Sequence, residues 1–466
     1  MMFSRFFLAI ILIFLCSCTD KISLNILSQE ANSLAAGVLD SSFGVGGAVQ
    51  IDNPAAYATA SRDDIFNAMI QDSSGNIFAV GTSDNNGTEE YNILLMKFNS
   101  TGVIDTSFGG GDGVVDINTG IIANDVGSDV ALLSTGEIVL VGDLGPTVTG
   151  MVFSKWNAAG TSETREKYQA STLAIDSCDT LLAKDDSAKA LAINSSDQVY
   201  ITGSCTQANG ATNLLVTRTN ASGVVDTSFS SAGTPGWFNY GTAPDTTDQE
   251  GNDIFLDSSG NPVIVGTVVN TTASTIFLIK LLADGTLDTS WGGGDGIIDD
   301  GTNGQSSRGI VDSSGRIYLV GRSFDGADWD MTIWRFTAVG VLDPTWGTGG
   351  ELDFNPGLGL KARAHDIKID ASGNIVVFGF TEGLATSRDN LTIWRYTSEG
   401  VLDSSFASGR GFIANTLSNS NNDQGKAGGI HSSTGKLIVV GTIRQDAVDT
   451  PCGNANPCDI NLLRFE

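Results

Sequence analysis

The sequence has little positive charge. It contains 25 Lys and Arg residues against 53 Asp and Glu residues, which gives a net charge of −28. A nucleic acid would repel such a chain, so no nucleic-acid partner is expected. A solvated acidic surface that keeps an exported protein soluble is the simplest explanation of the charge.

Residues and motifs that usually carry catalysis are also scarce. There are two histidines, His365 and His431, and no G-x-S-x-G nucleophile motif. The GGGDG segments at 109 and 292 are rich in glycine, but each leads into a strand-like run. They therefore lack the helix N-terminus that holds a phosphate group. No catalytic residue is predicted, although a role for the two histidines near the centre of the fold stays open.

Long apolar runs are missing too. The run near the N-terminus, from Phe6 to Leu15, is too short to span a bilayer as a helix. It follows Arg5 and precedes small residues, which predicts a signal peptide over residues 1–17. An ordinary cleaved secretory signal is one form that this peptide can take.

The end of this segment, Leu-Cys-Ser-Cys, resembles the lipobox of bacterial lipoproteins. The resemblance implies that Cys18 becomes the mature N-terminus and carries the lipid. Thr19, rather than an aspartate, follows Cys18, which favours the outer membrane over the inner membrane. Residues 18–36 are then a tether between the lipid anchor and the fold.

Glycine and short apolar runs are abundant. A phrase of two apolar runs joined by Ser-Ser-Gly or a similar turn occurs seven times, and a glycine ends the second run of each copy. Each copy predicts a β-hairpin. A third apolar run and a phrase of the type LDTSF with a further strand follow, so each repeat predicts four strands. The glycines lie 55 to 63 residues apart at Gly81, Gly142, Gly203, Gly266, Gly321, Gly379 and Gly441.

This repetition predicts an all-β fold, a seven-bladed β-propeller of four-stranded antiparallel blades over residues 37–466. The first repeat phrase supplies a single outer strand at GAVQI, and the chain finishes with three strands, GGIHS, KLIVVGT and NLLRF. Neither end makes a whole blade. We therefore expect the N-terminal outer strand to pair with the three C-terminal strands and to close the ring.

The segment KFNSTGVIDTSFG, which begins at Lys97, resembles the delta-60 repeat family of bacterial secreted proteins. Related phrases extend the resemblance over residues 37–466. The second repeat departs from the pattern, because KWNAAGTSETREKY lacks the LDxSF phrase. The resemblance implies a propeller in the bacterial cell envelope, and it implies no activity, because the family has no defined general one.

One cation recurs in the third strand of every repeat. An acidic residue follows eight positions later in six copies, including Lys155 and Glu163 in the second repeat. Arg464 lies too close to the C-terminus for such a partner, and the equivalent acid is Asp40. We expect an ion pair between Arg464 and Asp40 that joins the two ends of the ring.

The aromatic residue of the LDxSF phrase recurs as well. A ring at a fixed position of a repeat is expected to pack between adjacent blades rather than to stack on a bound carbohydrate. The six rings are Phe43, Phe108, Phe229, Trp291, Trp346 and Phe406.

Long and unequal connections are predicted at one face of the propeller, opposite the short hairpin turns. Variable loops on a rigid frame are the usual place of binding. The loop SFDGADWDM supplies the best candidate cluster, Trp329 with Asp325 and Asp328. His365 is expected close to the mouth of the central channel. A tryptophan that only fills its own loop is the alternative.

Four cysteines besides Cys18 remain after removal of the signal peptide. Cys452 and Cys458 lie in one loop, and Cys178 and Cys205 flank two strands at the loop face. An exported chain favours disulfides, so we expect one bond in each pair. A zinc site is the alternative, without neighbouring histidines to support it.

No cofactor is evident from the sequence. Asp129, Asp253 and Asp366 share one position in the first strand of the second, fourth and sixth repeats, so they are candidates for holding a cation in the channel. Calcium takes about six to eight oxygen ligands, which three separate blades rarely supply. Acidic residues of the loops are the other candidates for calcium.

The sequence thus predicts a lipid-anchored propeller of the bacterial cell envelope. We expect it to recognise a protein or a glycan through its loop face, without catalysis. A hydrolase or lyase with a site at the channel mouth is one alternative, and a periplasmic scaffold for envelope assembly is another. The fold does not choose among them.

Overall fold

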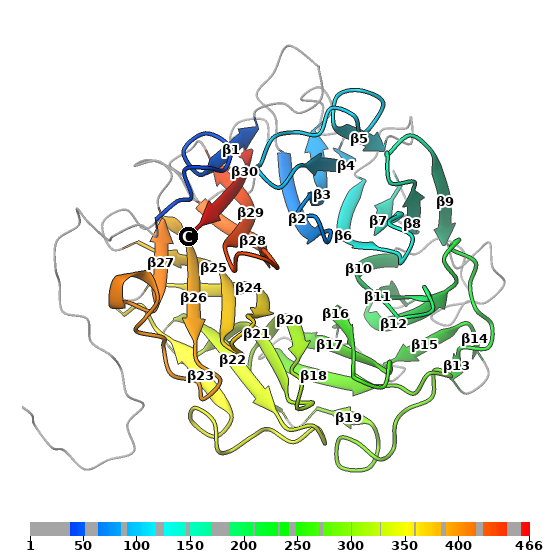
Figure 1. Cartoon of the computed structure of the whole chain (residues 1–466). Coiled ribbons are helices and arrows are strands. Elements are labelled where there is room, and N and C mark those ends of the chain that lie inside the picture. Colours follow the sequence, from blue (N-terminus) through cyan, green and yellow to red (C-terminus); the bar gives the residue numbers. More distant parts are fainter. Residues whose placement is uncertain are drawn as a thin grey trace, which may run out of the picture.

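The protein is a ring of seven four-stranded antiparallel sheets around a central axis, which confirms the predicted seven-bladed β-propeller (Figure 1). The structure is a computed structural model. It describes residues 38–51, 64–84, 91–117, 125–145, 150–168, 186–207, 210–231, 234–241, 248–269, 274–299, 301–326, 328–357, 360–383, 388–415, 423–444 and 458–466. The predicted signal peptide and tether, including Cys18, lie outside these ranges.

Each blade follows the chain from an inner strand at the axis to an outer strand at the rim. Blade one has β2 (Asp64–Gln71), β3 (Ile77–Asp84), β4 (Tyr91–Phe98) and β5 (Val114–Ile117). Blade two has β6 (Val126–Leu132), β7 (Ile138–Leu144), β8 (Gly150–Trp156) and β9 (Glu163–Tyr168). Blade three has β10 (Asp186–Ile193), β11 (Val199–Thr206), β12 (Thr212–Thr219) and β15 (Trp237–Tyr240), with a small ribbon of β13 (Ser230–Ser231) and β14 (Thr234–Pro235) beside it.

The other blades repeat this order. Blade four has β16 (Asp248–Leu256), β17 (Pro262–Val269), β18 (Ser274–Lys280) and β19 (Ile297–Ile298). Blade five has β20 (Gln305–Val311), β21 (Ile317–Phe324), β22 (Trp329–Phe336) and β23 (Glu351–Phe354). Blade six has β24 (Ala362–Ile369), β25 (Ile375–Glu382), β26 (Asp389–Tyr396) and, after the short helix η1 (Ala407–Gly409), β27 (Phe412–Asn415).

Blade seven is built from both ends of the chain. It contains β28 (Asp423–Ile430), β29 (Leu437–Arg444) and β30 (Cys458–Phe465), and β1 (Ala48–Ile51) adds the outer strand. β1 pairs antiparallel with β30, from Ala48 opposite Leu463 to Ile51 opposite Ile460. In Figure 1 the first and last coloured strands lie side by side at this point. The predicted closure of the ring is confirmed, and it leaves β30 paired on both sides.

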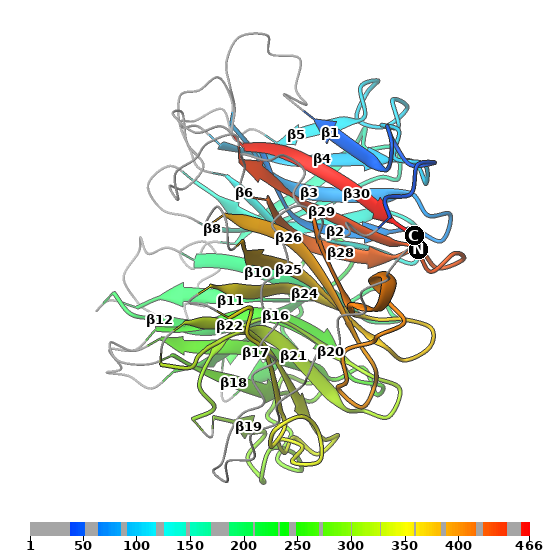
Figure 2. The same cartoon turned by 90° about the vertical axis from the view of Figure 1, so that its left-hand side faces the viewer.

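The strands fix two opposite ends of the propeller. The short turns between the first and second strands and between the third and fourth strands lie at one end, which we name the turn end (Figure 2). The second strands end, and the third strands begin, at the opposite end, which we name the loop end. Leu39 bridges to Phe465 at the turn end, so the described chain also begins there.

A β-bulge interrupts the inner strand of every blade at the same place. The recurring glycine of the second strand lies opposite this bulge. In blade six, a Cβ atom on Gly379 would collide with the carbonyl oxygen of Arg363, and the glycines of the other blades meet the equivalent oxygen. The glycine recurs because the bulged backbone leaves no room for a side chain.

The recurring aromatic rings are buried at the contacts between blades, where they were expected. Trp291 of blade four illustrates the arrangement, because its indole N–H donates to the carbonyl oxygen of Ala338 in blade five over 3.1 Å. Its ring lies so close to Gly340 that a Cβ atom there would overlap it. The recurring aromatic ring of one blade therefore packs against the turn glycine of the next blade.

The recurring cation of the third strand meets its acid in the other repeats but not in blade two. The distances between nitrogen and oxygen atoms are 2.7 Å in the Arg335–Asp343 pair and 3.2 Å in the Lys280–Asp288 pair. The expected Lys155–Glu163 pair is wrong. Similar pairs join Lys97 to Asp105, Arg218 to Asp226 and Arg395 to Asp403.

The exception in blade two has a local cause. In the other repeats the acid lies in the turn of the LDxSF phrase, which blade two lacks. Glu163 instead begins strand β9, where it pairs with Arg165 at 2.6 Å on the same face of the strand. Lys155 pairs with Glu137 at 3.0 Å.

Arg464 and Asp40 lie together across the closure. Nε of Arg464 is 2.6 Å from Oδ2 of Asp40, whose side chain is 2% exposed. Lys436 approaches the same carboxylate at 2.8 Å, and Nη1 of Arg464 donates to the carbonyl oxygen of Ser100 in blade one. Although burial opposes ionisation, the hydrogen bonds from Lys436, Ser42 and Arg464 hold the pKa of Asp40 far below its usual range.

Substitution of the glycine opposite a bulge should be more costly than substitution of a turn glycine in the same blade. We expect Gly379→Ala to lower the free energy of unfolding by about 3 kcal/mol, because the new Cβ overlaps backbone. Gly373→Ala introduces only the strain of a positive φ and should cost about 1 kcal/mol. Urea denaturation measures both, and equal losses would contradict the assigned role of the bulge.

Reversal of the charge at the closure should weaken the ring. We expect Arg464→Glu to lower the free energy of unfolding by about 3–5 kcal/mol, because it leaves Asp40 buried beside a like charge. Arg165→Glu breaks a more exposed pair on β9 and should cost about 1 kcal/mol or less. An Arg464→Glu variant with the melting temperature of the native protein would sink this interpretation.

Candidate functional site

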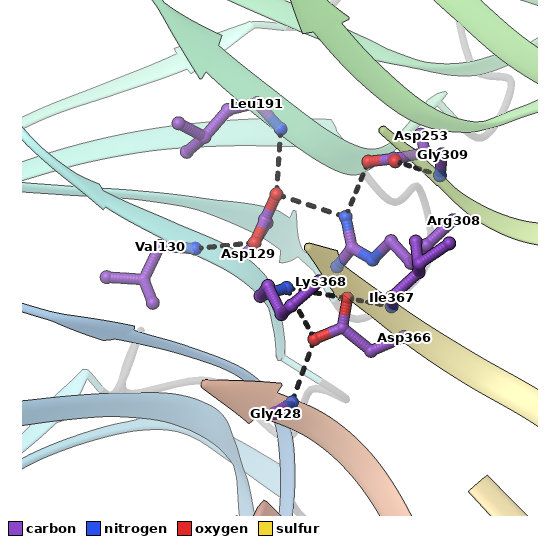
Figure 3. Close-up of polar contacts among 10 residues, drawn as sticks. All are labelled: Asp129, Val130, Leu191, Asp253, Arg308, Gly309, Asp366, Ile367, Lys368 and Gly428. Carbon is purple, nitrogen blue, oxygen red and sulfur yellow. Dashed lines mark hydrogen bonds and ion pairs between the residues drawn. The ribbon is translucent and has the colours of Figure 1, made fainter. Parts of the chain in front are cut away.

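Charged side chains meet at the axis just after the bulge of the inner strands. The residue after the bulge is an aspartate in blades two, four and six, namely Asp129, Asp253 and Asp366. In blade five the same position holds Arg308. Together with Lys368 of β24, we name these residues the axial network (Figure 3).

The axial network links blades that are far apart in the ring. Nη1 of Arg308 lies 2.8 Å from Oδ1 of Asp253 in the neighbouring blade and 3.3 Å from Oδ2 of Asp129 across the axis. Nζ of Lys368 lies 2.7 Å from Oδ2 of Asp366. Figure 3 shows the carboxylates directed toward these two cations.

Each of the three aspartates also accepts a backbone N–H from the next blade. The donors are Leu191 at 3.0 Å, Gly309 at 2.7 Å and Gly428 at 2.8 Å. An aspartate in every second blade thus fixes the contact with the blade that follows. These residues therefore stabilise the contacts between the blades of the propeller.

The sequence suggested that these aspartates hold a free cation. In the structure the guanidinium of Arg308 lies between Asp129 and Asp253 instead and supplies the positive charge there. Although burial opposes its charged form, the carboxylates of Asp129, Asp253 and Asp366 raise the pKa of Arg308 above its usual value. The part of the chain that the structure describes contains no group of three or more metal-ligating side chains. Calcium binding by loop acids stays a prediction.

A second set of basic side chains lies nearer the loop end, and within the described residues no acidic side chain pairs with them. We name Arg322, Arg363 and His365 the cationic cluster. Arg363 and His365 belong to inner strand β24, and Arg322 to β21 of the preceding blade. Nε and Nη2 of Arg322 donate to Oε1 of Gln305 at 3.0 and 2.8 Å. Within the described ranges, neither arginine forms an ion pair.

Two nitrogen atoms of this cluster are buried without a hydrogen-bond partner. They are Nε of Arg363 and Nε2 of His365, whose ring lies 5.8 Å from the ring of Phe380. A buried polar group without a partner costs about 1–3 kcal/mol, and a charged group costs more. Among the described residues, no acidic side chain forms an ion pair with Arg363. Such a group in a native structure needs an explanation, and a missing ligand is one.

The cluster changes the protonation of its own members. Burial, and then the charges of Lys426, Arg363 and Arg322, lowers the pKa of His365 well below its usual value. Burial and the charge of Arg322 lower the pKa of Arg363 to about 10. At neutral pH the imidazole is therefore neutral, while the arginines remain charged.

The loop between β21 and β22 brings two aromatic rings to the cluster. Phe324 is 43% exposed, and its ring lies 5.4 Å from that of Trp329. The guanidinium carbon of Arg322 lies 4.3 Å from the centre of a Trp329 ring. This is a cation–π contact, so Arg322 connects the aromatic rings at the loop end with the axis.

Asp325 and Asp328 shape this loop. The backbone N–H of Asp328 donates to Oδ1 of Asp325 at 2.9 Å, and the N–H of Asp325 donates to the carbonyl oxygen of Asp328 at 3.2 Å. The loop thus holds the predicted cluster of Asp325, Asp328 and Trp329 together. Its aspartates close the hairpin, and its Trp329 ring contacts Arg322.

Sequence reasoning missed Arg322 and Arg363. A signal for Arg322 existed, because it follows the recurring glycine in blade five, where no other repeat has a basic residue. The structure places the other histidine, His431, far from this cluster along the strands. His431 lies in the turn after β28 at the turn end, with Nδ1 3.2 Å from the hydroxyl oxygen of Ser433.

The predicted disulfides stay predictions. Cys205 is buried on β11, and Cys178 lies outside the described residues. Cys452 also lies outside them, and Cys458 begins β30. None of the helices in the described ranges has the length and hydropathy of a membrane span.

Comparisons with known proteins agree with the fold and leave the activity undetermined. Residues 195–229 match the model of a domain of unknown function (DUF5122) β-propeller, which covers part of blade three. No curated protein matches the chain. The delta-60 resemblance and the lipoprotein signal stay predictions.

Similar solved structures have low sequence identity to this chain. The polysaccharide lyase Uly1 is 9% identical at a TM-score of 0.43, over 88% of this chain and 91% of that chain. Sqt1 from Chaetomium thermophilum is 8% identical at 0.43, over 90% and 100%. The Hadza microbial sialidase Hz136 is 8% identical at 0.40, over 81% and 74%. At these TM-scores the similarities support no statement about function.

Removal of the guanidinium from the axial network should destabilise the protein in a pH-dependent way. We expect Arg308→Met to cost about 3–5 kcal/mol at neutral pH, because it leaves buried carboxylates unpaired. Burial already raises the pKa of Asp253, and removal of the opposing charge of Arg308 raises it further, so the folded variant gains stability as the pH falls from about 7 toward about 4.

Urea denaturation at both pH values measures this effect. Lys368→Met removes a more exposed partner of Asp366 and should cost less. A loss for Arg308→Met that does not shrink at acidic pH would show that the arginine acts by its volume and not by its charge.

Proposed function

We propose that this protein is a lipid-anchored recognition module of the bacterial cell envelope that binds a glycan through the loop end of blades five and six. The observation that carries the proposal is the exposed ring of Phe324 beside Trp329, stacked on Arg322. Flat aromatic rings bind the apolar faces of sugars, and arginines bind their oxygen-bearing groups. A large apolar ring at a free loop end otherwise has no role in the frame.

The position of the anchor agrees with this proposal. The described chain begins at Val38, beside the C-terminal end of β30 at the turn end. A tether attached there leaves the opposite end of the propeller free. The loop end, with Trp329 at the beginning of β22, is that opposite end (Figure 2). Anchoring through Cys18 would therefore not cover the aromatic rings.

An enzyme is the second candidate, and His365 favours it. His365 places an unpartnered imidazole nitrogen beside two arginines, and such a group of donors and cations would stabilise negative charge that develops on a bound substrate. A hydrolase or lyase would lose turnover in His365→Ala, whereas binding by the aromatic rings would continue. A scaffold for envelope assembly would instead need a protein partner at the same loops.

Replacement of Trp329 should weaken glycan binding. We expect Trp329→Ala to lower the affinity about tenfold, which corresponds to about 1.4 kcal/mol, because stacking on the sugar is lost. Trp329→Phe should retain most of the affinity. Trp156→Ala, at the turn end of blade two, is the control that removes a tryptophan far from the loop end.

Binding is measured on immobilised polygalacturonate, chondroitin sulfate and neutral dextran, with the melting temperature as a check of folding. If the Trp329→Ala variant is retained as strongly as the native protein, the binding surface lies elsewhere. If no polysaccharide is retained while a protein is crosslinked at the loop end, recognition is of a protein.

A further inference from the structure

We infer that the cationic cluster of Arg322, Arg363 and His365 is an anion-binding site that takes a carboxylate or sulfate group of an acidic sugar. The nature of the sugar rests on the proposed function, whereas the anion site rests on the cluster itself. The site lies on β24 and β21, nearer the loop end than the axial network.

The first argument is that the donors of this cluster lack acceptors. Nε of Arg363 and Nε2 of His365 are buried without partners, and both come from the same strand. An anion between them would accept a hydrogen bond from the guanidinium and, once the imidazole is protonated, from Nε2 as well. Arg322, fixed by Gln305 and Trp329, supplies a second positive charge.

The second argument is the contrast with the neighbouring residue. Asp366 follows His365 directly, and its carboxylate is fully engaged with Lys368, Gly428 and the N–H of Ile367. The recurring arginines of the third strands, such as Arg335, are likewise paired with acids. Within the ranges that the structure describes, these structural charges have partners of opposite sign, and the cationic cluster has none.

The third argument is that Arg322 connects the aromatic rings with the other members of the cluster. Arg322 contacts Trp329 on one side and acts on Arg363 and His365 on the other. A sugar ring stacked at the loop end would therefore direct an acidic substituent toward the axis. The net charge of −28 disfavours nucleic acid, so an acidic substituent of a sugar is the fitting ligand.

Binding at this site should be coupled to protonation of His365. The charged groups that act on it are Lys426, Arg363 and Arg322, all cations, and Asp366 lies next to it on the strand. A bound anion opposes the cations and raises the pKa of His365, so the imidazole takes up a proton on binding. The affinity for the anion therefore rises as the pH falls.

The two histidines of the chain make a direct test possible. Isotope-labelled histidine gives two sets of NMR signals, and His431→Gln assigns them. Sodium sulfate and galacturonic acid are the probes. We expect them to shift the signals of His365 and raise its pKa, with His431 as the internal reference. The affinity for sulfate should rise about tenfold from about pH 7.5 to about pH 5.5. Equal responses of both histidines would overturn the site.

Variants separate a binding site from a structural role. Arg363→Gln should lower the sulfate affinity about tenfold, and Arg363→Lys should restore part of it, because one charge carries much of the attraction. Arg316→Gln changes the net charge equally at the turn end and should have no effect. Because Arg363 has no acidic partner, its neutralisation should leave the melting temperature unchanged or raise it. A sharp drop would instead assign Arg363 to the frame.

The same variants keep the two proposals apart. If His365 responds to sulfate but no polysaccharide is retained, the anion site stands and glycan recognition fails. If polysaccharide is retained, lost in Trp329→Ala and unchanged in Arg363→Gln, glycan recognition stands and the anion site is wrong.

Discussion

The β-bulge in each inner strand is the constraint on which the rest of the structure depends. It places one extra residue on the axial side of the strand and turns the following residue toward the axis and the next blade. The glycine opposite the bulge is needed because a carbonyl oxygen occupies the place of its side chain. Repeated around the ring, this single feature sets the positions of Asp129, Asp253, Arg308 and Asp366.

The charged residues of the inner strands have two different environments at different depths along the axis. Immediately after the bulge, Arg308 and Lys368 balance the three aspartates and tie the blades to one another. At and before the bulge of blade six, His365 and Arg363 have no such balance. A stable frame requires that charges in its interior be neutralised by the protein itself. An anion-binding site instead requires a positive charge that only the bound anion neutralises.

Closure of the ring also determines how the protein can be presented. Pairing of β1 with β30, together with Arg464 and Asp40, brings the start of the fold to the turn end. The described chain therefore begins at the end of the propeller opposite Trp329, because the strands of each blade span the distance between the two ends.

The sequence by itself determined the fold. Seven glycines at similar spacing, hairpin turns between apolar runs, and an incomplete repeat at each terminus specify a closed ring, because these are local patterns that repetition makes unambiguous. It also pointed to the candidate loop between β21 and β22, because this connection differs from those of the other repeats. The ion pair predicted between Lys155 and Glu163 is wrong, because the LDxSF phrase is missing there and Glu163 begins a strand instead.

Only the tertiary structure decided what the axial residues do. Arg308 and Asp129 are 179 positions apart in the sequence, so no local pattern shows that they meet. Arg322 and Arg363 belong to different repeats, and each alone is an ordinary basic residue of a strand. Their combination with His365 exists because the consecutive blades five and six pack against each other, and because burial removes the water that would otherwise satisfy their charges.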